Sequence, residues 1–377
     1  HIVCSLDMSL DGKNKKLAVL EDYFIPMYIE ALVESCHSFG ISVDLYTFRE
    51  GLAPYAGVDN VFYAGEHPNL KSAKSIKEFD KRFYEMTKDK GYDYVLSDYL
   101  PLSFGCCVFH VYSIVERMKL CPNFLYRLIF YLGHYQMIKY FKNLFQKQPK
   151  IFAVSSIVKD DLIRNCNIPE ERIKIIFPGC ENSELVEEYD IKKYDKTKPF
   201  VFGLSAVGFV RKGGFLFLDA IRRLKKDYPN IKARIIYPDH RKNLGLKLYL
   251  WFYGLKDIVE IVGFQKDMSS FYRSLDCLVV PSIFEAFGRV VIEGMSHKIP
   301  VIVGSSVGAK DIIKDGENGF VFEADGYSGK PLAEKMKEVI RNYNNLDNLV
   351  NSAYTLSKSG FTWKNFAEEI FKELYLS

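Results

Sequence analysis

Two glutamates flank the start of a predicted helix in "PSIFEAFGRVVIEGMSHKIPVIVGSS" (281–306). Glu285 falls in the loop after a strand-like run, and Glu293 follows eight residues later. Eight residues of complete helix span about 12 Å, and the loop shortens this distance somewhat. Two carboxylates so placed could accept hydrogen bonds from hydroxyl groups at both ends of one extended ligand. Gly288 has no side chain and would let the main chain approach that ligand closely. Each glutamate alone also fits a solvated position near a helix N-terminus.

A pair of cations precedes a second predicted helix in "FGLSAVGFVRKGGFLFLDAIRRL" (202–224). The strand ends near Ala206 and the helix begins near Gly213, so Arg211 and Lys212 lie at the helix N-terminus. The helix dipole disfavours a cation there by about 0.3–1 kcal/mol. A bound phosphate would reverse this preference, because helix N–H groups, guanidinium and ammonium could all converge on it. The alternative is a solvated Arg-Lys pair in a surface loop.

Strand-like runs alternate with amphipathic helical patterns along most of the chain. This alternation predicts an α/β protein with parallel sheets covered by helices on both faces. The polar stretch 178–200 interrupts it, so we expect two doubly wound domains at 1–180 and 200–355. A last amphipathic helix, 360–377, is expected to pack back on the first domain. Ligands of such sheets bind beyond the carboxyl ends of the strands, which is where both motifs lie.

Composition and motif searches exclude several classes of protein. The 377 residues carry a net charge of +4, too little to suggest nucleic-acid binding. No dinucleotide-binding glycine motif and no P-loop is found, and the eight cysteines show no metal-binding spacing, as expected for reduced thiols. No stretch has the length and apolar composition of a transmembrane helix, and none has the pattern of a targeting segment. We expect a cytoplasmic protein because the cysteines fit the reduced thiols of a cytosolic compartment, and the alternative is a chain from which a targeting segment has been removed.

The joint pattern Pro-Ser-x-x-Glu-x-Phe-Gly, Glu-Gly-Met and Pro-Val-Ile-Val in 281–303 resembles the retaining glycosyltransferases of family four. The resemblance extends to Arg-Lys-Gly at 211–213, "VGFQ" at 262–265 and "DIIKDGENGFVF" at 311–322. It covers nearly all of the second domain, whereas the first domain matches only in layout and around "FHV". The family has the GT-B fold, in which two Rossmann-like domains face each other across a cleft.

The resemblance implies catalytic roles for four residues. Glu285 would bind the transferred sugar, Arg211 and Lys212 would stabilise the departing diphosphate, and His110 would bond to the sugar or to the catalytic loop. Electrostatic help of this kind is usually the largest catalytic contribution. For His110, a satisfied core position is the alternative.

The resemblance also implies a donor-binding set. Glu293 would bind the ribose, and the remaining members would act largely through the main chain: Gly12, Gly263, Phe264, Phe287, Gly288 and Arg289. The sequence departs from the family pattern at Ala206, where many members have arginine. It also keeps Gly12 alone in the first glycine loop, and has Gly308 and Asp311 in place of a glycine pair and glutamate.

The expected activity is transfer of a hexose, with retention, from a nucleotide-diphosphate sugar to a hydroxyl of a glycan or lipid-linked acceptor. A UDP-sugar is favoured by the family's habits. No Asp-x-Asp is present, so we expect neither a metal ion nor another cofactor. The alternatives are a GT-B phosphorylase or epimerase, and a non-catalytic nucleotide- or sugar-binding protein. The cation pair argues against the last of these, because sugar binding alone needs no contact with a diphosphate.

A basic, aromatic segment points to a membrane surface. Residues 117–150 hold seven Lys/Arg, eight Phe/Tyr and no Asp or Glu. Six apolar residues are predicted along one helical stripe flanked by Arg127, Lys139 and Lys142, namely Phe124, Leu128, Tyr131, Tyr135, Ile138 and Phe145. Such a helix suits the interface of an anionic membrane. A shorter segment of similar character in the second domain, 240–256, could be a second contact with the membrane. We expect a peripheral enzyme on the inner face of the cell membrane, similar in layout to lipopolysaccharide-core glucosyltransferases, with a buried helix as the alternative.

Overall fold

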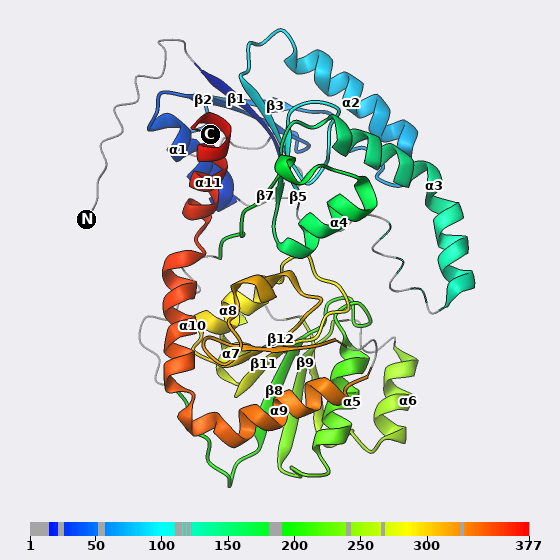
Figure 1. The fold of residues 1–377 in the computed structure, drawn as a ribbon, viewed down its shortest axis with the longest axis vertical. Coiled ribbons are helices and arrows are strands. Elements are labelled where there is room, and N and C mark those ends of the chain that lie inside the picture. The colour runs from blue at the N-terminus through cyan, green and yellow to red at the C-terminus, as the bar shows by residue number, and fades with distance from the viewer. Residues whose placement is uncertain are drawn as a thin grey trace.

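The computed structural model describes residues 15–21, 26–51, 57–109, 115, 118, 121, 123–180, 191–238, 243–264, 268–324 and 328–376. These residues form two α/β domains, one above the other in Figure 1, each built on one parallel sheet. The prediction of two doubly wound domains is confirmed. The described cysteines form no disulfide with one another, and Cys4 lies outside the described residues.

The first domain contains a sheet of seven described strands in the order β3-β2-β1-β4-β5-β6-β7. The strands are β1 (Lys16–Glu21), β2 (Ser42–Thr47), β3 (Asn60–Tyr63), β4 (Tyr94–Asp98), β5 (Cys106–Phe109), β6 (Ile151–Ala153) and β7 (Ile173–Ile175). Each pairs in parallel with its neighbours. The central strands are short apolar runs because helices cover both faces of the sheet.

Helices of the first domain divide between the two faces of this sheet. They are α1 (Pro26–His37), α2 (Ala73–Thr87), α3 (Phe124–Lys147) and α4 (Ser156–Cys166), followed by the 3-10 turn η2 (Glu170–Arg172). Leu17 and Val19 of β1 pack with α1 and the C-terminal helix, whereas Ala18 and Leu20 pack with α2 and α3. Successive side chains of a strand point to opposite faces, so one strand supplies two cores.

The second domain is built on six described strands in the order β10-β9-β8-β11-β12-β13. The strands are β8 (Phe200–Ser205), β9 (Ile231–Ile236), β10 (Val259–Val262), β11 (Cys277–Val280), β12 (Val301–Gly304) and β13 (Phe320–Phe322). The helices and turns are α5 (Gly214–Leu224), α6 (Leu244–Phe252), α7 (Met268–Arg273), α8 (Val290–Ser296), η5 (Gly308–Ile312), α9 (Lys330–Asn342), η6 (Tyr343–Asn345) and α10 (Asp347–Gly360). Cys277 and Val279 pack with α5 and α9, and Leu278 and Val280 pack with α7 and α8.

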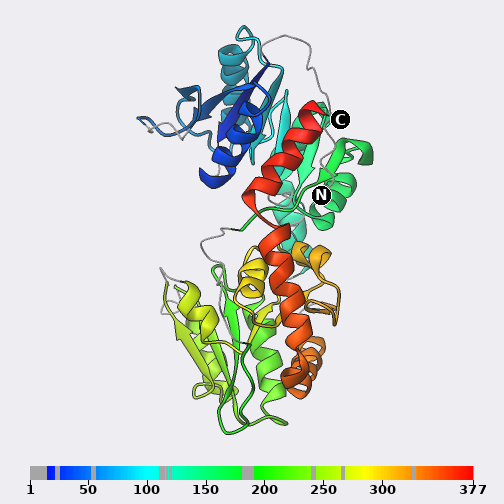
Figure 2. The same ribbon diagram turned by 90° about the vertical axis from the view of Figure 1, so that its left-hand side faces the viewer.

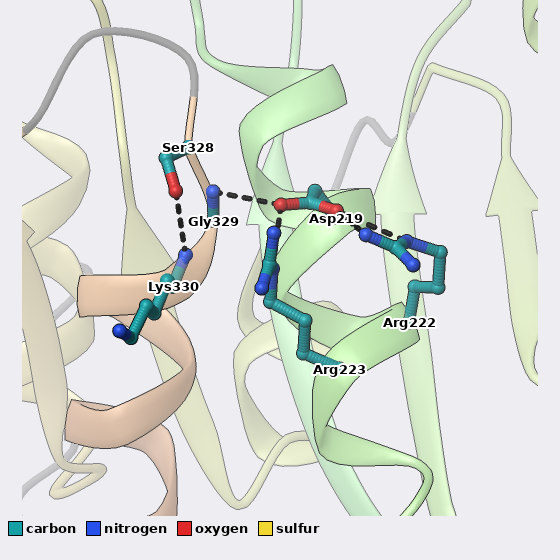
Figure 3. A network of polar contacts seen from close by, with 6 residues as sticks. All are labelled: Asp219, Arg222, Arg223, Ser328, Gly329 and Lys330. Carbon is teal, nitrogen blue, oxygen red and sulfur yellow. Dashed lines mark hydrogen bonds and ion pairs between the residues drawn. The ribbon is translucent and has the colours of Figure 1, made fainter.

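A polar network joins the two helices on one face of the second sheet (Figure 3). The Asp219 carboxylate of α5 accepts the Gly329 N–H at the start of α9 at 2.9 Å, and also bonds Arg222 and Arg223. Burial raises the pKa of Asp219, but these hydrogen bonds outweigh it and leave the pKa below its usual value. A Cβ at position 329 would lie 2.4 Å from the Ala220 nitrogen, so glycine permits this close helix packing.

The chain crosses between the domains twice, and the two crossings touch. The Cys180 N–H donates to the Phe361 carbonyl at 2.9 Å. A Cβ on Gly179 would lie 2.3 Å from the Trp363 nitrogen. After the second crossing, α11 (Trp363–Tyr375) lies against α1 of the first domain, as Figures 1 and 2 show. The final helix is therefore part of the first domain's core.

Candidate functional site

The candidate site is built from loops that follow the strands of the second sheet. These loops face the first domain, because the loop after β11 contacts the start of α4 (Figure 1). The cation pair follows β8, and the loop with Glu285 follows the adjacent β11. Gly263 and Phe264 follow β10, three positions from β11. Adjacent strands are about 4.8 Å apart, so these two places are about 14 Å apart across the sheet edge. An extended ligand could span them.

The loops after β8 and β11 are bonded to each other. Pro281 ends the β11 ladder because proline has no N–H to donate. The Ile283 N–H donates to the Arg211 carbonyl at 2.9 Å. Gly213 has a φ of +73°, and a Cβ there would lie 2.0 Å from the Pro281 carbonyl oxygen. Gly213 therefore serves the close approach of the two loops, which accounts for a glycine that the helix itself would disfavour.

Two cations converge on one carboxylate oxygen at this junction. Lys212 Nζ lies 2.5 Å and Arg211 Nη1 3.0 Å from Glu285 Oε2. The side chains of Lys212 and Glu285 are each only 15% exposed. Ser282 Oγ donates to the same oxygen at 3.4 Å. Because one carboxylate balances only one of two cations, this corner has positive charge available for an anion.

The N–H groups of the first loop differ from the sequence prediction. The N–H groups of Lys212, Gly213 and Gly214 donate to the carbonyls of Gly208, Val210 and Phe209 within their own turn. These three N–H groups are therefore not available to a phosphate, whereas convergence of the following N–H groups of α5 on a phosphate stays a prediction. The cationic side chains of Arg211 and Lys212 are placed to receive an anion.

The helix predicted between Glu285 and Glu293 begins late in this stretch. α8 starts at Val290, because Gly288 has a φ of +98°, which a regular helix does not allow. A Cβ on Gly288 would lie 3.3 Å from Glu285 Cγ, so glycine leaves room for the Glu285 side chain. The N–H groups of residues 287–289 donate no hydrogen bond to the described residues, as is usual before a helix.

Phe287 and Arg289 turn their side chains toward the domain junction. The buried Phe287 ring packs 5.9 Å from the Phe177 ring, and the Arg289 guanidinium lies 5.8 Å from the Trp363 ring of α11. The expected contact of their main chain with a ligand stays a prediction.

Glu293 is oriented by a tyrosine that the sequence motifs did not indicate. The hydroxyl of Tyr272, a buried residue of α7, donates to Glu293 Oε2. The Tyr272 ring lies 4.9 Å from the His297 ring, and His297 Nδ1 lies 2.7 Å from the Glu293 carbonyl oxygen. Tyr272 is 21 residues before Glu293, so no short spacing could have revealed it.

The remaining residues singled out in the sequence are either exposed, buried or outside the described part of the chain. Phe264 is 78% exposed, and a Cβ on Gly263 would meet open space, so a flat group could lie along this main chain. Gly12 and His110 lie outside the described residues. Ala206 is fully buried, which leaves Arg211 as the guanidinium of this corner.

Comparisons with known proteins match both domains. Residues 186–356 match the family described as "Glycosyl transferases group 1", and residues 25–184 match "Glycosyltransferase Family 4". The chain belongs to the group 1 glycosyltransferases.

Curated relatives of this glycosyltransferase align over part of their length. An uncharacterized glycosyltransferase of Methanocaldococcus jannaschii is 29% identical over 241 residues, 62% of this chain and 62% of that protein. The capsular polysaccharide biosynthesis glycosyltransferase CapM of Staphylococcus aureus is 27% identical over 50% of this chain and 52% of CapM. The chain thus spans less than two thirds of the length of these relatives.

Solved structures share the two-domain arrangement. Sucrose-phosphate synthase from Thermosynechococcus elongatus has a TM-score of 0.72 at 16% identity, covering 96% of this chain and 100% of that one. WaaG, a glycosyltransferase involved in lipopolysaccharide biosynthesis, has a TM-score of 0.68 at 17% identity, covering 95% and 99%. The predicted GT-B fold of this glycosyltransferase is confirmed.

Two exposed apolar surfaces lie on the same side of the glycosyltransferase, at the right in Figure 1. On α3 the exposed residues surround the first half of the helix, and they are Phe124, Leu125, Tyr126, Leu128, Ile129, Leu132 and Tyr135. On α6 they are Leu244, Leu248, Trp251 and Phe252. The single stripe predicted for α3 is wrong, because Phe145 is buried against Phe109 with ring centroids 4.8 Å apart. Among the described residues, no helix is long and apolar enough to cross a membrane.

Within the described part of this glycosyltransferase, no three His, Cys, Asp or Glu side chains are grouped so that they could hold a metal ion.

Proposed function

We propose that this protein is a retaining, metal-independent hexosyltransferase that uses a nucleotide-diphosphate sugar and a glycan or lipid-linked acceptor. The observation that carries the proposal is the convergence of Arg211 and Lys212 on Glu285 in a half-buried corner. A diphosphate would compete with Glu285 for the two cations. The released carboxylate would then accept hydrogen bonds from the hydroxyls of the sugar.

The layout of the corner suits departure of a charged leaving group. In the transfer, the bond from the sugar C1 to the diphosphate oxygen breaks, and the acceptor oxygen bonds to C1 on the same face. The acceptor proton leaves with the diphosphate. Lys212 and Arg211 would stabilise the negative charge that grows on the diphosphate, and fixed charges in a half-buried site are more effective than water.

Glu293 and the loop after β10 would hold the nucleoside. Glu293, held by the Tyr272 hydroxyl, would accept hydrogen bonds from the ribose, and the main chain at Gly263 and Phe264 would lie along the base. HepE of Anabaena, a protein of this fold solved with UDP and glucose, has a TM-score of 0.67 at 16% identity. This likeness supports a nucleotide-sugar donor, and uracil is our proposal for the base.

Donor turnover tests this function. The protein would be incubated with UDP-glucose, UDP-galactose and GDP-mannose, and release of the nucleoside diphosphate would be measured. Lys212→Ala should depress release from each active donor alike, because Lys212 serves the shared diphosphate. Lys226→Ala, which removes an exposed lysine just beyond the far end of α5, is the matched control and should match the wild type. Loss confined to one donor would contradict the role of Lys212.

We further propose that α3, with α6 as a smaller second contact, binds the surface of an anionic membrane. Arg127 and Lys139 are exposed on α3, and with Lys142 they form no ion pair with the described residues. Cations near an anionic surface contribute about 1 kcal/mol each. The exposed aromatic and aliphatic side chains beside them could enter the interface. A lipid-linked acceptor would then be within reach of the enzyme.

Sedimentation with liposomes tests the membrane proposal. Binding is expected to phosphatidylglycerol-containing liposomes and not to pure phosphatidylcholine, and it should weaken with salt. Changing Arg127, Lys139 and Lys142 to Gln together should abolish it. The control changes three lysines of α2, which are Lys74, Lys77 and Lys81, and removes the same charge from a neighbouring helix. Equal loss in both triple variants would show a net-charge effect and contradict a role for α3.

A further inference from the structure

The loop that carries Glu285 is held from both domains. We call residues 283–289 the donor loop. Its Glu285 carbonyl accepts the Gly308 N–H at 2.9 Å, and its Phe287 carbonyl accepts the Ala309 N–H at 2.8 Å. Both partners belong to the second domain. The Ala286 carbonyl between them accepts the Ser155 hydroxyl of the first domain at 2.6 Å. One of three consecutive carbonyls thus depends on the other domain.

Ser155 makes this contact from the start of α4. It is the N-cap of α4, fully buried, and its Oγ also accepts the Val158 N–H at 3.3 Å. A Cβ at Gly308 would lie 2.6 Å from Ser155 Oγ and 2.0 Å from the Ala286 carbonyl oxygen. Glycine at 308 is therefore what allows the serine and the carbonyl to meet. This contact lies in the apolar core that the two domains share.

A second contact joins the same two elements. The Asp311 carboxylate of η5 accepts the Ser156 N–H and the Ser156 hydroxyl, each at 2.6 Å. A carboxylate at a helix N-terminus is favoured by the helix dipole. The second domain thus caps a helix of the first domain, while that helix bonds the donor loop in return.

We propose that Ser155 is a positioning residue for sugar transfer, with Asp311 keeping α4 in place. Ser155 holds the Ala286 carbonyl and so fixes the orientation of the preceding residue, Glu285, for contact with the sugar. The first domain thus completes the donor site of the second, and separation of the domains would release the donor loop. This inference rests on the proposed transferase function.

The loop of Arg211 and Lys212 has supports that do not involve Ser155. Besides the bond from Ile283 of the donor loop to the Arg211 carbonyl, it is held by hydrogen bonds within its own turn and by the close approach of Gly213 to Pro281, which lies outside the donor loop. Ser155→Ala should therefore lower turnover and leave the affinity for UDP within about twofold of the wild type. A misplacement of this kind costs up to about 100-fold in rate, and we expect a loss of ten- to a hundredfold in kcat. Asp311→Asn should give a smaller loss of the same kind.

The matched control is Ser72→Ala. Ser72 is the N-cap of α2 and accepts the Ser75 N–H at 3.3 Å, so its loss also removes a helix cap, but away from the domain junction. Both alanine variants should lower the melting temperature. Only Ser155→Ala should lower kcat and speed hydrogen exchange in the peptide 283–289.

Two readouts separate failure of this inference from failure of the proposed function. Exchange in 283–289 that is unchanged in Ser155→Ala would overturn the inference, whatever the activity. So would an active wild type whose kcat is equally retained in Ser155→Ala and Ser72→Ala. A wild type that releases no nucleotide from any sugar donor would overturn the proposed function, while the exchange comparison would still decide whether Ser155 holds the loop.

Discussion

Replacing Glu285 with glutamine should separate sugar transfer from diphosphate binding. Oε2 of Glu285 accepts hydrogen bonds from Lys212 and Arg211 at 2.5 and 3.0 Å. Glutamine keeps the shape of the side chain but removes its charge. The variant should lose the carboxylate that we assign to the sugar, and its two cations should become more available to a diphosphate.

The structure gives the expected size of the effects. Hydrogen bonds to charged groups contribute about 1.5–3 kcal/mol, and a glutamine oxygen retains part of this, so we expect a loss of stability of about 2 kcal/mol. In a domain of this size, 1 kcal/mol shifts the melting temperature by about 2–4 °C, which gives a fall of about 4–8 °C. Glu285 is assigned to the transferred sugar, and loss of a group that orients the reacting sugar costs about 100-fold in turnover.

Calorimetry with UDP and a nucleotide-release assay would measure both effects. We expect the Glu285→Gln variant to bind UDP as tightly as the wild type or several-fold tighter, while its turnover falls about 100-fold. The control is Glu260→Gln, which breaks the exposed Arg234–Glu260 pair at 2.7 Å and should change neither property. A parallel loss of UDP affinity and turnover in Glu285→Gln would refute the division of roles between Glu285 and the cations.

Three further predictions concern Glu293, stability and metal ions. Tyr272→Phe should raise the donor KM several-fold with little change in kcat, because it frees the Glu293 carboxylate; an unchanged KM would contradict the ribose role. Glu373→Gln should lower the melting temperature at pH 7, because hydrogen bonds from Lys174 and Lys150 keep the pKa of Glu373 below its usual 4.5. The difference from the wild type should shrink as the pH falls below 4.5 and through the lowered pKa, and a constant difference would rule out the charge as its cause. Turnover should survive excess EDTA, and a strict Mg²⁺ or Mn²⁺ requirement would refute the metal-independent proposal.

The residues that follow strands could be located from the sequence, because the pattern of strands and helices is read from neighbouring residues. Ligands of α/β sheets bind beyond the carboxyl ends of the strands. Arg211 and Lys212 follow a strand and precede a helix, and so does Glu285. In a parallel sheet the carboxyl ends of the strands share one edge. The strand order then decides which loops meet, and it places β8 beside β11. This order could not be derived from the pattern of elements alone.

The features that the sequence did not predict depend on contacts between distant parts of the chain. Tyr272 reaches Glu293 from another helix, and Ser155 reaches Ala286 across 131 residues and a domain boundary. The sequence placed Gly213 only at the start of a predicted helix, whereas its positive φ serves a close approach to Pro281. In each case the partner lies on an element whose position only the tertiary structure defines.

A crystal structure with UDP bound tests the central claim most directly. We predict that the diphosphate lies between Arg211, Lys212 and the start of α8, with its oxygens within hydrogen-bond distance of both cations and with Glu285 released from them. The uracil should lie at Gly263 and Phe264. A structure in which UDP binds elsewhere, while Arg211 and Lys212 stay on Glu285, would contradict the assignment of this corner as the diphosphate site.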